Sequence, residues 1–101
     1  MNNQREVTIY GRLGKKPQLR LTKKEKPFCY FTLAELVEGE EAPRWHNIVI
    51  WGKEAEYWSS VLNKGTSVFV RGRMVDREYK SDSGELKIYR EVNADAIGFT
   101  N

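Results

Sequence analysis

Apolar and polar side chains alternate along several stretches of the chain, and a period of two is typical of half-buried strands. Five stretches alternate in this way or are rich in bulky apolar groups: residues 6–13, 28–36, 44–51, 66–79 and 85–99. The last stretch is expected to be interrupted near Asn93. Turn-forming residues separate the stretches, for example 81–84 between the last two, and a short extended return at 18–22 follows the first. The pattern therefore predicts five main strands.

One segment changes to a helical period. In residues 53–63 the apolar side chains of Trp58, Val61 and Leu62 recur at spacings of three and four, and Gly65 follows as a stop signal suited to a left-handed conformation. Five strands with a single helix between the third and the fourth describe the OB-fold, an all-β Greek-key barrel. An open sheet of three plus two strands packed on one helix is the alternative.

The stretch 44–51 has two unlike faces. Ile48 and Ile50 point to one side, as a barrel core requires, while Trp45 and Trp51 point to the other, close to the cation of Lys53. Flat exposed rings next to cations can stack bases and neutralise phosphates, as a single-stranded nucleic acid requires. The alternative is that one indole closes a subunit interface or caps the end of the barrel.

Charge is distributed unevenly along the 101 residues, a length that leaves room for one domain. The net charge is +3 and the pI about 9.1, and residues 11–27 hold seven Lys and Arg against one Glu. Residues 35–43 hold four Glu and no base. Such a dipole draws a polyanion to one side of the surface, although a solvated lysine-rich loop would have the same composition.

The remaining composition excludes several classes of function. Cys29 is the only cysteine and His46 the only histidine, so no zinc set can be assembled, and no nucleophile has an arguable base. We expect Cys29 to be a small buried apolar group, and we expect no cofactor and no catalytic role. No run of 18 apolar residues is present, which predicts no membrane span and a cytoplasmic protein.

Four segments and a hairpin sequence resemble one known family. They are Y-G-R-L-G at 10–14, F-T-L-A at 31–34, W-H-N-I-V-I-W-G-K-E-A-E at 45–56, N-K-G-T-S-V-F-V-R-G at 63–72 and D-R-E-Y-K-S-D-S-G-E at 76–85. In this order they resemble the bacterial single-stranded-DNA-binding proteins over nearly the whole chain. The resemblance implies an OB-fold, a homo-oligomer (a tetramer in preference to a dimer) and sequence-independent binding and protection of single-stranded DNA in replication, repair and recombination.

The resemblance also assigns residues. Trp45 and Trp51 fall at stacking positions of the family, Tyr79 at a position that usually holds tryptophan, and His46 near a subunit interface. The segment 37–43 is short and acidic and lacks a further stacking tryptophan. Because this sequence stops at Asn101, the resemblance is to a short form without the family's acidic tail, unless a tail has been removed. That short form also resembles the primosomal replication protein N, so an adaptor that mainly binds proteins at the replication fork is an alternative.

Together, these arguments predict two sets of residues. The predicted DNA-binding residues are Phe28, Tyr30, Trp45, Trp51 and Tyr79 among the aromatics and Arg12, Lys15, Lys53, Arg71, Arg73 and Arg77 among the cations. The predicted subunit interface comprises Val7, Ile9 and His46. Phe28 and Tyr30 are equally consistent with a second subunit as the partner. A nuclease or an RNA-binding protein on the same fold is a further alternative, which would need an acidic metal site or selectivity for the 2′-hydroxyl.

Overall fold

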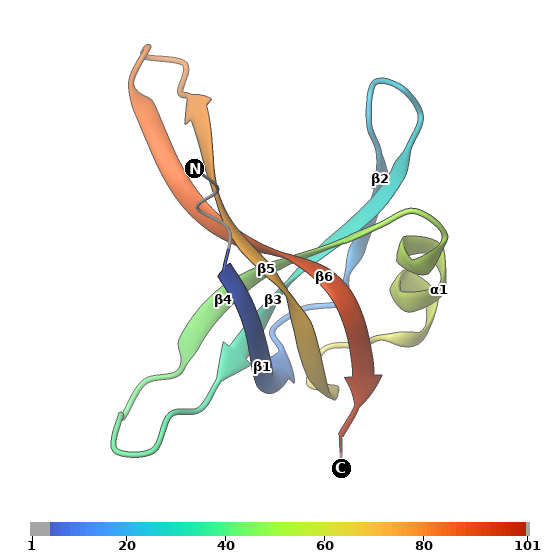
Figure 1. Cartoon of the computed structure of the whole chain (residues 1–101), viewed down its shortest axis with the longest axis vertical. Helices are drawn as coiled ribbons and strands as arrows, with labels where there is room; N and C mark the ends of the chain where they lie inside the picture. Colours follow the sequence, from blue (N-terminus) through green and yellow to red (C-terminus); the bar gives the residue numbers. More distant parts are fainter. Residues whose placement is uncertain (1–4, 101) are drawn as a thin grey trace.

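Six strands and one helix make up the computed structural model, which describes residues 5–100 except for the side chain of Tyr79 (Figure 1). The elements are β1 (Arg5–Leu13), β2 (Gln18–Leu21), β3 (Pro27–Glu35), β4 (Arg44–Trp51), α1 (Lys53–Val61), β5 (Ser67–Lys80) and β6 (Leu86–Phe99). The bounds of β4 agree with the prediction at both ends, and those of the other long strands agree within one residue.

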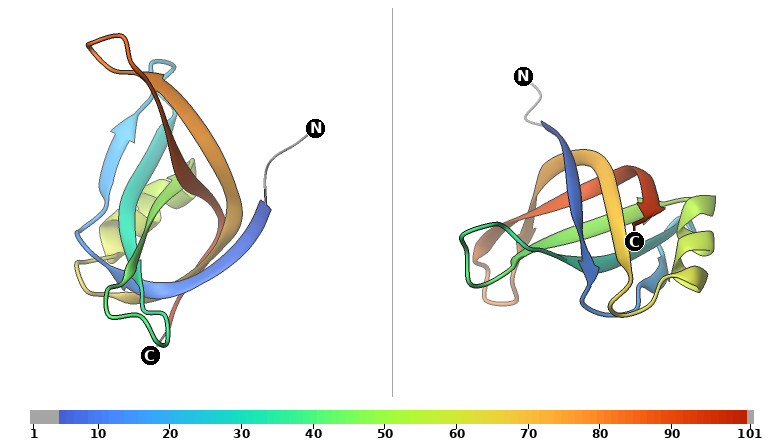
Figure 2. Two further views of the ribbon diagram at one scale, coloured as in Figure 1. Left: turned by 90° about the vertical axis from the view of Figure 1, so that its left-hand side faces the viewer. Right: turned by 90° about the horizontal axis from the view of Figure 1, so that it is seen from below.

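The sheet closes into a barrel. Its strand order is β1-β5-β6-β4-β3-β2, and an additional pairing joins β1 to β3 at Arg12 and Leu13. That pairing leaves five strands in a closed ring and β2 as a short outer strand on β3, as the two views in Figure 2 show. The OB-fold prediction is therefore confirmed and the open-sheet alternative is wrong. The helix follows Arg44–Trp51 as predicted, and it lies between β4 and β5 in this numbering because β2 is counted.

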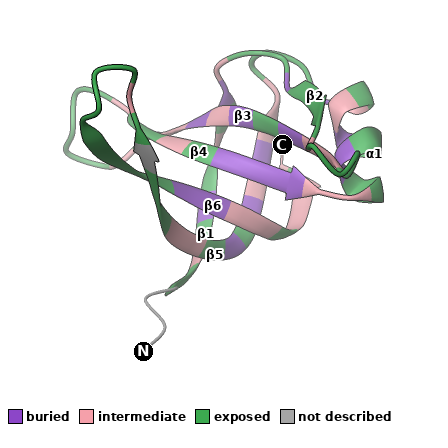
Figure 3. Ribbon diagram, turned by 90° about the horizontal axis from the view of Figure 1, so that it is seen from above, coloured by how far each residue is buried: buried purple, intermediate pink, exposed green. Residues whose placement is uncertain are grey.

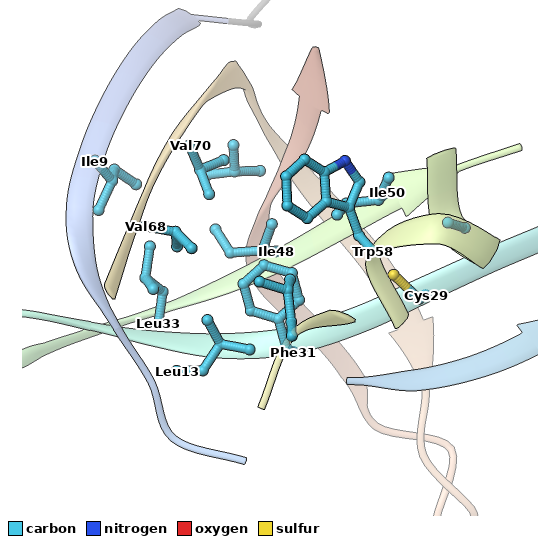
Figure 4. Close-up of a cluster of buried hydrophobic side chains, with 13 residues drawn as sticks. Ile9, Leu13, Cys29, Phe31, Leu33, Ile48, Ile50, Trp58, Val68 and Val70 are labelled. Carbon is cyan, nitrogen blue, oxygen red and sulfur yellow. The ribbon is translucent and has the colours of Figure 1, made fainter. Parts of the chain in front are cut away.

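The barrel core is built from the inward-facing residues of every long strand. Figure 4 shows this cluster, whose labelled members are Ile9, Leu13, Cys29, Phe31, Leu33, Ile48, Ile50, Trp58, Val68 and Val70. Trp58 comes from α1 and is 9% exposed, which confirms its predicted packing role. Cys29 is fully buried as predicted, and this burial raises the pKa of its thiol to about 11.

Barrel closure depends on a glycine in β1. A Cβ atom added at Gly11 would lie 2.3 Å from the backbone oxygen of Ala34 on β3. Real side chains do not approach backbone so closely, and only glycine lets the two strands meet there. The glycine at position 11 of the Y-G-R-L-G segment thus allows β1 to approach β3 closely enough to close the barrel.

The ends of α1 are held by residues outside its apolar face. Gly52, with φ of 75°, turns the chain from β4 into the helix, and Gly65, with φ of 84°, adopts the predicted left-handed conformation. The Lys16 ammonium donates to the carbonyl oxygens of Ser59 and Leu62 at 3.3 and 3.2 Å. A cation at this C-terminal end also interacts favourably with the negative end of the helix dipole and so stabilises the helix.

Two hairpins extend beyond the barrel on the same side of the molecule. In Figure 1 the β5–β6 hairpin and the β2–β3 hairpin diverge upward, and Figure 3 views this side with the mainly buried centre of β4 between them. The expected interruption of the last strand is a register shift. Arg71 pairs with Ala96 and Gly72 with Ala94, so Asp95 is the extra residue of a bulge, two positions beyond Asn93.

Candidate nucleic-acid interface

A groove of about 670 Å³ lies between the outer faces of β3 and β4 and the β5–β6 hairpin. The lining residues are Phe28, Tyr30, Phe31, Asn47, Ile48, Val49, Trp51, Arg77, Tyr89 and Glu91. Strand alternation explains part of the set, because Phe28 and Tyr30 pair with Trp51 and Val49 and therefore share a face with them. Four of the predicted DNA-binding residues meet here: Phe28, Tyr30, Trp51 and Arg77.

Three aromatic rings form a row along this face. The centroids of Trp51 and Phe28 are 5.2 Å apart with an interplanar angle of 36°, and those of Phe28 and Tyr30 are 6.4 Å apart at 26°. Tyr30 is 40% exposed, and its hydroxyl donates to Oε1 of Gln18 on β2 at 3.0 Å. The row offers flat apolar surface at the open side of the barrel, where it can be reached by a base.

Trp51 is half-buried and its orientation is fixed by two contacts besides Phe28. Its indole Nε1 donates to Oδ1 of Asn93 at 2.8 Å, and Lys26 Nζ lies 5.4 Å from the ring centroid. The ammonium position is within the range of a cation–π contact, and Lys26 itself is exposed. A cation that is itself exposed to the solvent therefore lies over the half-buried indole.

Arg77 faces the groove in company with an acid. Its Nε lies 3.2 Å from Oε2 of Glu91, whose side chain is 6% exposed against 48% for Arg77. Charge-assisted pairs of this kind hold both side chains in place. The carboxylate also cancels part of the positive charge that Arg77 would offer to a phosphate.

Trp45 lies at the other end of β4, on the same outer face as Trp51 and about 20 Å away at 3.4 Å per residue. Its side chain is well exposed, at 59%. One edge of the ring rests against the turn after β1, since a Cβ atom at Gly14 would lie 2.7 Å from Cζ3 of Trp45. The two predicted stacking tryptophans are therefore separate platforms.

The other predicted cations are spread along the outer surface. In the strand register, Arg73 of β5 lies opposite Asn93 of β6. Arg71, the next residue on the same face of β5, lies opposite Thr8 of β1. Arg12 donates to the carbonyl oxygen of Gly65 at 3.2 Å, on the β1 side. Lys15 and Lys53 are exposed in the turn after β1 and at the start of α1. The side chain of Tyr79 lies outside the described residues.

The predicted interface residues have partners within the chain. His46 Nε2 lies 3.0 Å from Oε1 of Glu35, with the imidazole 18% exposed. Ile9 is 3% exposed and belongs to the core, and Val7 is partly buried against it. Any contact that Ile9 makes with a second subunit would therefore involve the β1 backbone more than its side chain.

The residues of the site that were not predicted include Lys26, Tyr89, Glu91 and Asn93. Three of them alternate on the outer face of β6, and their proximity to β4 depends on the parallel pairing of Val49 with Asn93. Period-two spacing on a predicted strand was a visible signal for these three. The sequence did not indicate that β6 would lie beside β4, which brings these three side chains to the site.

Within residues 5–100 no group of three His, Cys, Asp or Glu side chains could hold a metal ion. The single described helix, α1, is too short to cross a membrane.

Comparison with known proteins identifies one family. The sequence model of the Single-strand binding protein family matches residues 4–100. A single-stranded DNA-binding protein of Bacillus cereus is 36% identical over 98 residues, which are 92% of this chain and 58% of that protein. Single-stranded DNA-binding protein A of Bacillus subtilis is 34% identical over 98 residues, 92% of this chain and 57% of its own length. The chain thus spans less than three fifths of the length of these relatives.

Proposed function

The chain belongs to the single-strand binding protein family, and we propose that it binds and protects single-stranded DNA without sequence preference. The observation that carries this proposal is the row of three rings, Trp51, Phe28 and Tyr30, in a groove beside Lys26 and Arg77. Aromatic platforms next to cations bind a flexible strand by its bases and its phosphates together.

Bases stack on the aromatic row in this proposal. Every base has a π-face, so stacking tolerates any sequence, and each stacked base contributes about 1–3 kcal/mol. Trp45 forms a second platform about 20 Å along β4. Tyr79, at the position that usually holds tryptophan in the family, is a further proposed stacking residue on the hairpin.

Phosphates are neutralised by the cations on the outer surface. The proposed contacts are Arg12, Lys15, Lys53, Arg71, Arg73 and Arg77, to which the position of Lys26 over Trp51 adds a seventh. Each phosphate contact with a single strand should contribute about −0.7 to the slope of log K against log salt. Binding should therefore weaken steeply as salt rises.

A homo-oligomer, a tetramer in preference to a dimer, is part of the proposal. β1 pairs with β5 along residues 5–12 and meets β3 only at Arg12 and Leu13, so one backbone edge of β1 has no strand partner in residues 5–100. Unpaired edges are templates for association. His46 and Val7 would then lie near the contact, and the mass of the protein in solution measures the subunit number.

The proposed activity involves binding without chemical turnover, in DNA replication, repair and recombination. A cytoplasmic location belongs to the same proposal, because the relatives are bacterial DNA-binding proteins. The adaptor alternative is not favoured, since the relatives named above are single-stranded DNA-binding proteins.

The test is the affinity for a labelled oligo-dT, measured by fluorescence anisotropy at fixed salt. Trp51→Ala removes the largest ring of the row and should weaken binding about 5- to 150-fold, the equivalent of 1–3 kcal/mol. Tyr57→Ala is the matched control, because Tyr57 is an exposed aromatic on α1 outside the groove. Equal affinity of Trp51→Ala and wild type would refute the proposal.

A further inference from the structure

Asn93 lies beside the aromatic row but does not itself offer a surface for stacking. It is half-buried on β6, where its backbone pairs with Val49 of β4 on one side and with Arg73 of β5 on the other. Its side chain projects from the same outer face as Trp51 and reaches the indole across the parallel β4–β6 pair. The contact joins residues 42 positions apart in the sequence.

The hydrogen bond between the two residues has a defined direction. An indole Nε1–H can only donate, so the atom of Asn93 that faces it at 2.8 Å must be the carbonyl oxygen. Without this acceptor, the contacts of the Trp51 ring given above are those with Phe28 and the flexible, exposed Lys26. Within the part of the chain that the structure describes, the Asn93 carbonyl is thus the hydrogen-bond acceptor that holds the ring.

The backbone around Asn93 is itself tightly fixed. A Cβ atom added at Gly72 would lie 2.1 Å from the backbone oxygen of Asn93 and 2.9 Å from Cα of Ala94. The bulge at Asp95 begins immediately afterwards and changes the register of β6. Gly72 and the bulge therefore set the position from which the Asn93 side chain reaches Trp51.

We propose that Asn93 is a positioning residue that holds the Trp51 indole in the orientation that receives a base. This inference depends on the proposed function, since it concerns how that groove is prepared for a single strand. A ring already held in its bound orientation loses less conformational freedom on binding. The carboxamide therefore increases affinity through Trp51 and not through contact with DNA.

A double-mutant cycle tests this separation. Trp51→Phe keeps an aromatic ring but has no Nε1–H, so Asn93 has nothing to accept. Asn93→Ala should weaken oligo-dT binding about 3- to 10-fold in the wild-type background, as expected for one hydrogen bond, and leave the affinity unchanged in the Trp51→Phe background. Asn63→Ala, which removes an exposed carboxamide after α1, is the matched control and should bind as wild type.

Two outcomes of the cycle overturn the proposal. An equal loss in both backgrounds would mean that Asn93 contacts DNA or supports the strand independently of the indole. No loss in either background would mean that the hydrogen bond does not prepare the ring for binding.

A second measurement needs no DNA and therefore separates this proposal from the proposed function. In the NMR spectrum of the free protein, Asn93→Ala should shift the indole Nε1–H resonance of Trp51, speed its exchange and weaken the cross-peaks between the Trp51 and Phe28 rings. The resonance is assigned by its absence in Trp51→Phe. Unchanged cross-peaks and exchange would overturn the positioning role even if the protein binds DNA as proposed.

Discussion

Replacing Glu91 with glutamine should make the protein less stable and yet a tighter binder of single-stranded DNA. The Glu91 carboxylate is the buried acid of the groove, 3.2 Å from Nε of Arg77. Glutamine keeps the size and one acceptor oxygen but removes the negative charge. The guanidinium of Arg77, half-exposed at the groove wall, then has its full positive charge available for a phosphate.

The two effects can be given magnitudes. Loss of the charge of the buried Glu91 from its ion pair with Arg77 should lower the free energy of unfolding by about 1–3 kcal/mol. A carboxylate about 6 Å from a phosphate repels it by about 3 kcal/mol at an effective dielectric constant near 20, and salt screening reduces this value. At 50 mM salt we therefore expect affinity to rise about 5- to 10-fold in Glu91→Gln. The slope of log K against log salt should become steeper by up to about 0.7, the value for one full phosphate contact, because Glu91 cancels part of the charge of Arg77 in the wild type.

The assay is a salt titration of oligo-dT binding, with stability followed by urea unfolding. Asp76→Asn is the matched control, because Asp76 also pairs with an arginine, Arg90, at 3.1 Å, and the substitution removes the same charge. Asp76 lies outside the groove lining and both members of its pair are exposed, so stability and salt slope should change little. Weaker binding by Glu91→Gln at low salt, or an unchanged slope, would show that the carboxylate does not mask Arg77.

Three further predictions concern the barrel. Lys16→Ala should lower the free energy of unfolding by about 0.5–1.5 kcal/mol in urea titrations, because the α1 carbonyls lose their only described cation. Gly11→Ala should cost at least about 1–3 kcal/mol in the same assay, since the added methyl meets the backbone of Ala34; stability equal to wild type would refute the closure argument. Between pH 9 and 11 the Cys29 thiol ionises in the unfolded chain but stays protonated in the fold, so this residue should make stability fall by up to about 3 kcal/mol as pH rises. Cys29→Ala should remove that part of the pH dependence in parallel unfolding titrations.

Much of the barrel could be predicted because its strands follow strict alternation. In β4 the side chains of Ile48 and Ile50 face the core and those of Trp45 and Trp51 face out, as the period of two requires. The helix was equally recognisable, with Trp58 buried at its apolar positions and Gly65 left-handed after its end. These features depend on neighbouring residues in the sequence, so local patterns are sufficient to predict them.

The site was less predictable because it depends on contacts between distant segments. Alternation places Arg73 and Arg77 on one face of β5, but only Arg77, which lies farther along the hairpin, lines the groove. For Glu91 and Asn93, period-two spacing indicated a shared face of the last strand, but no local signal indicated which strand that face would meet. Their roles follow from the parallel register of β4 and β6.

Barrel closure and the binding groove follow from the same packing requirement. The groove needs β6 to lie against β4 in one register, because Asn93 reaches Trp51 only from beside Val49. That register in turn needs β5 to approach β6 at Gly72, where no side chain could fit. A substitution at Gly72 should therefore disturb the indole of Trp51 although the two residues share no contact, and the glycine of the V-R-G segment contributes to the platform as well as to the fold.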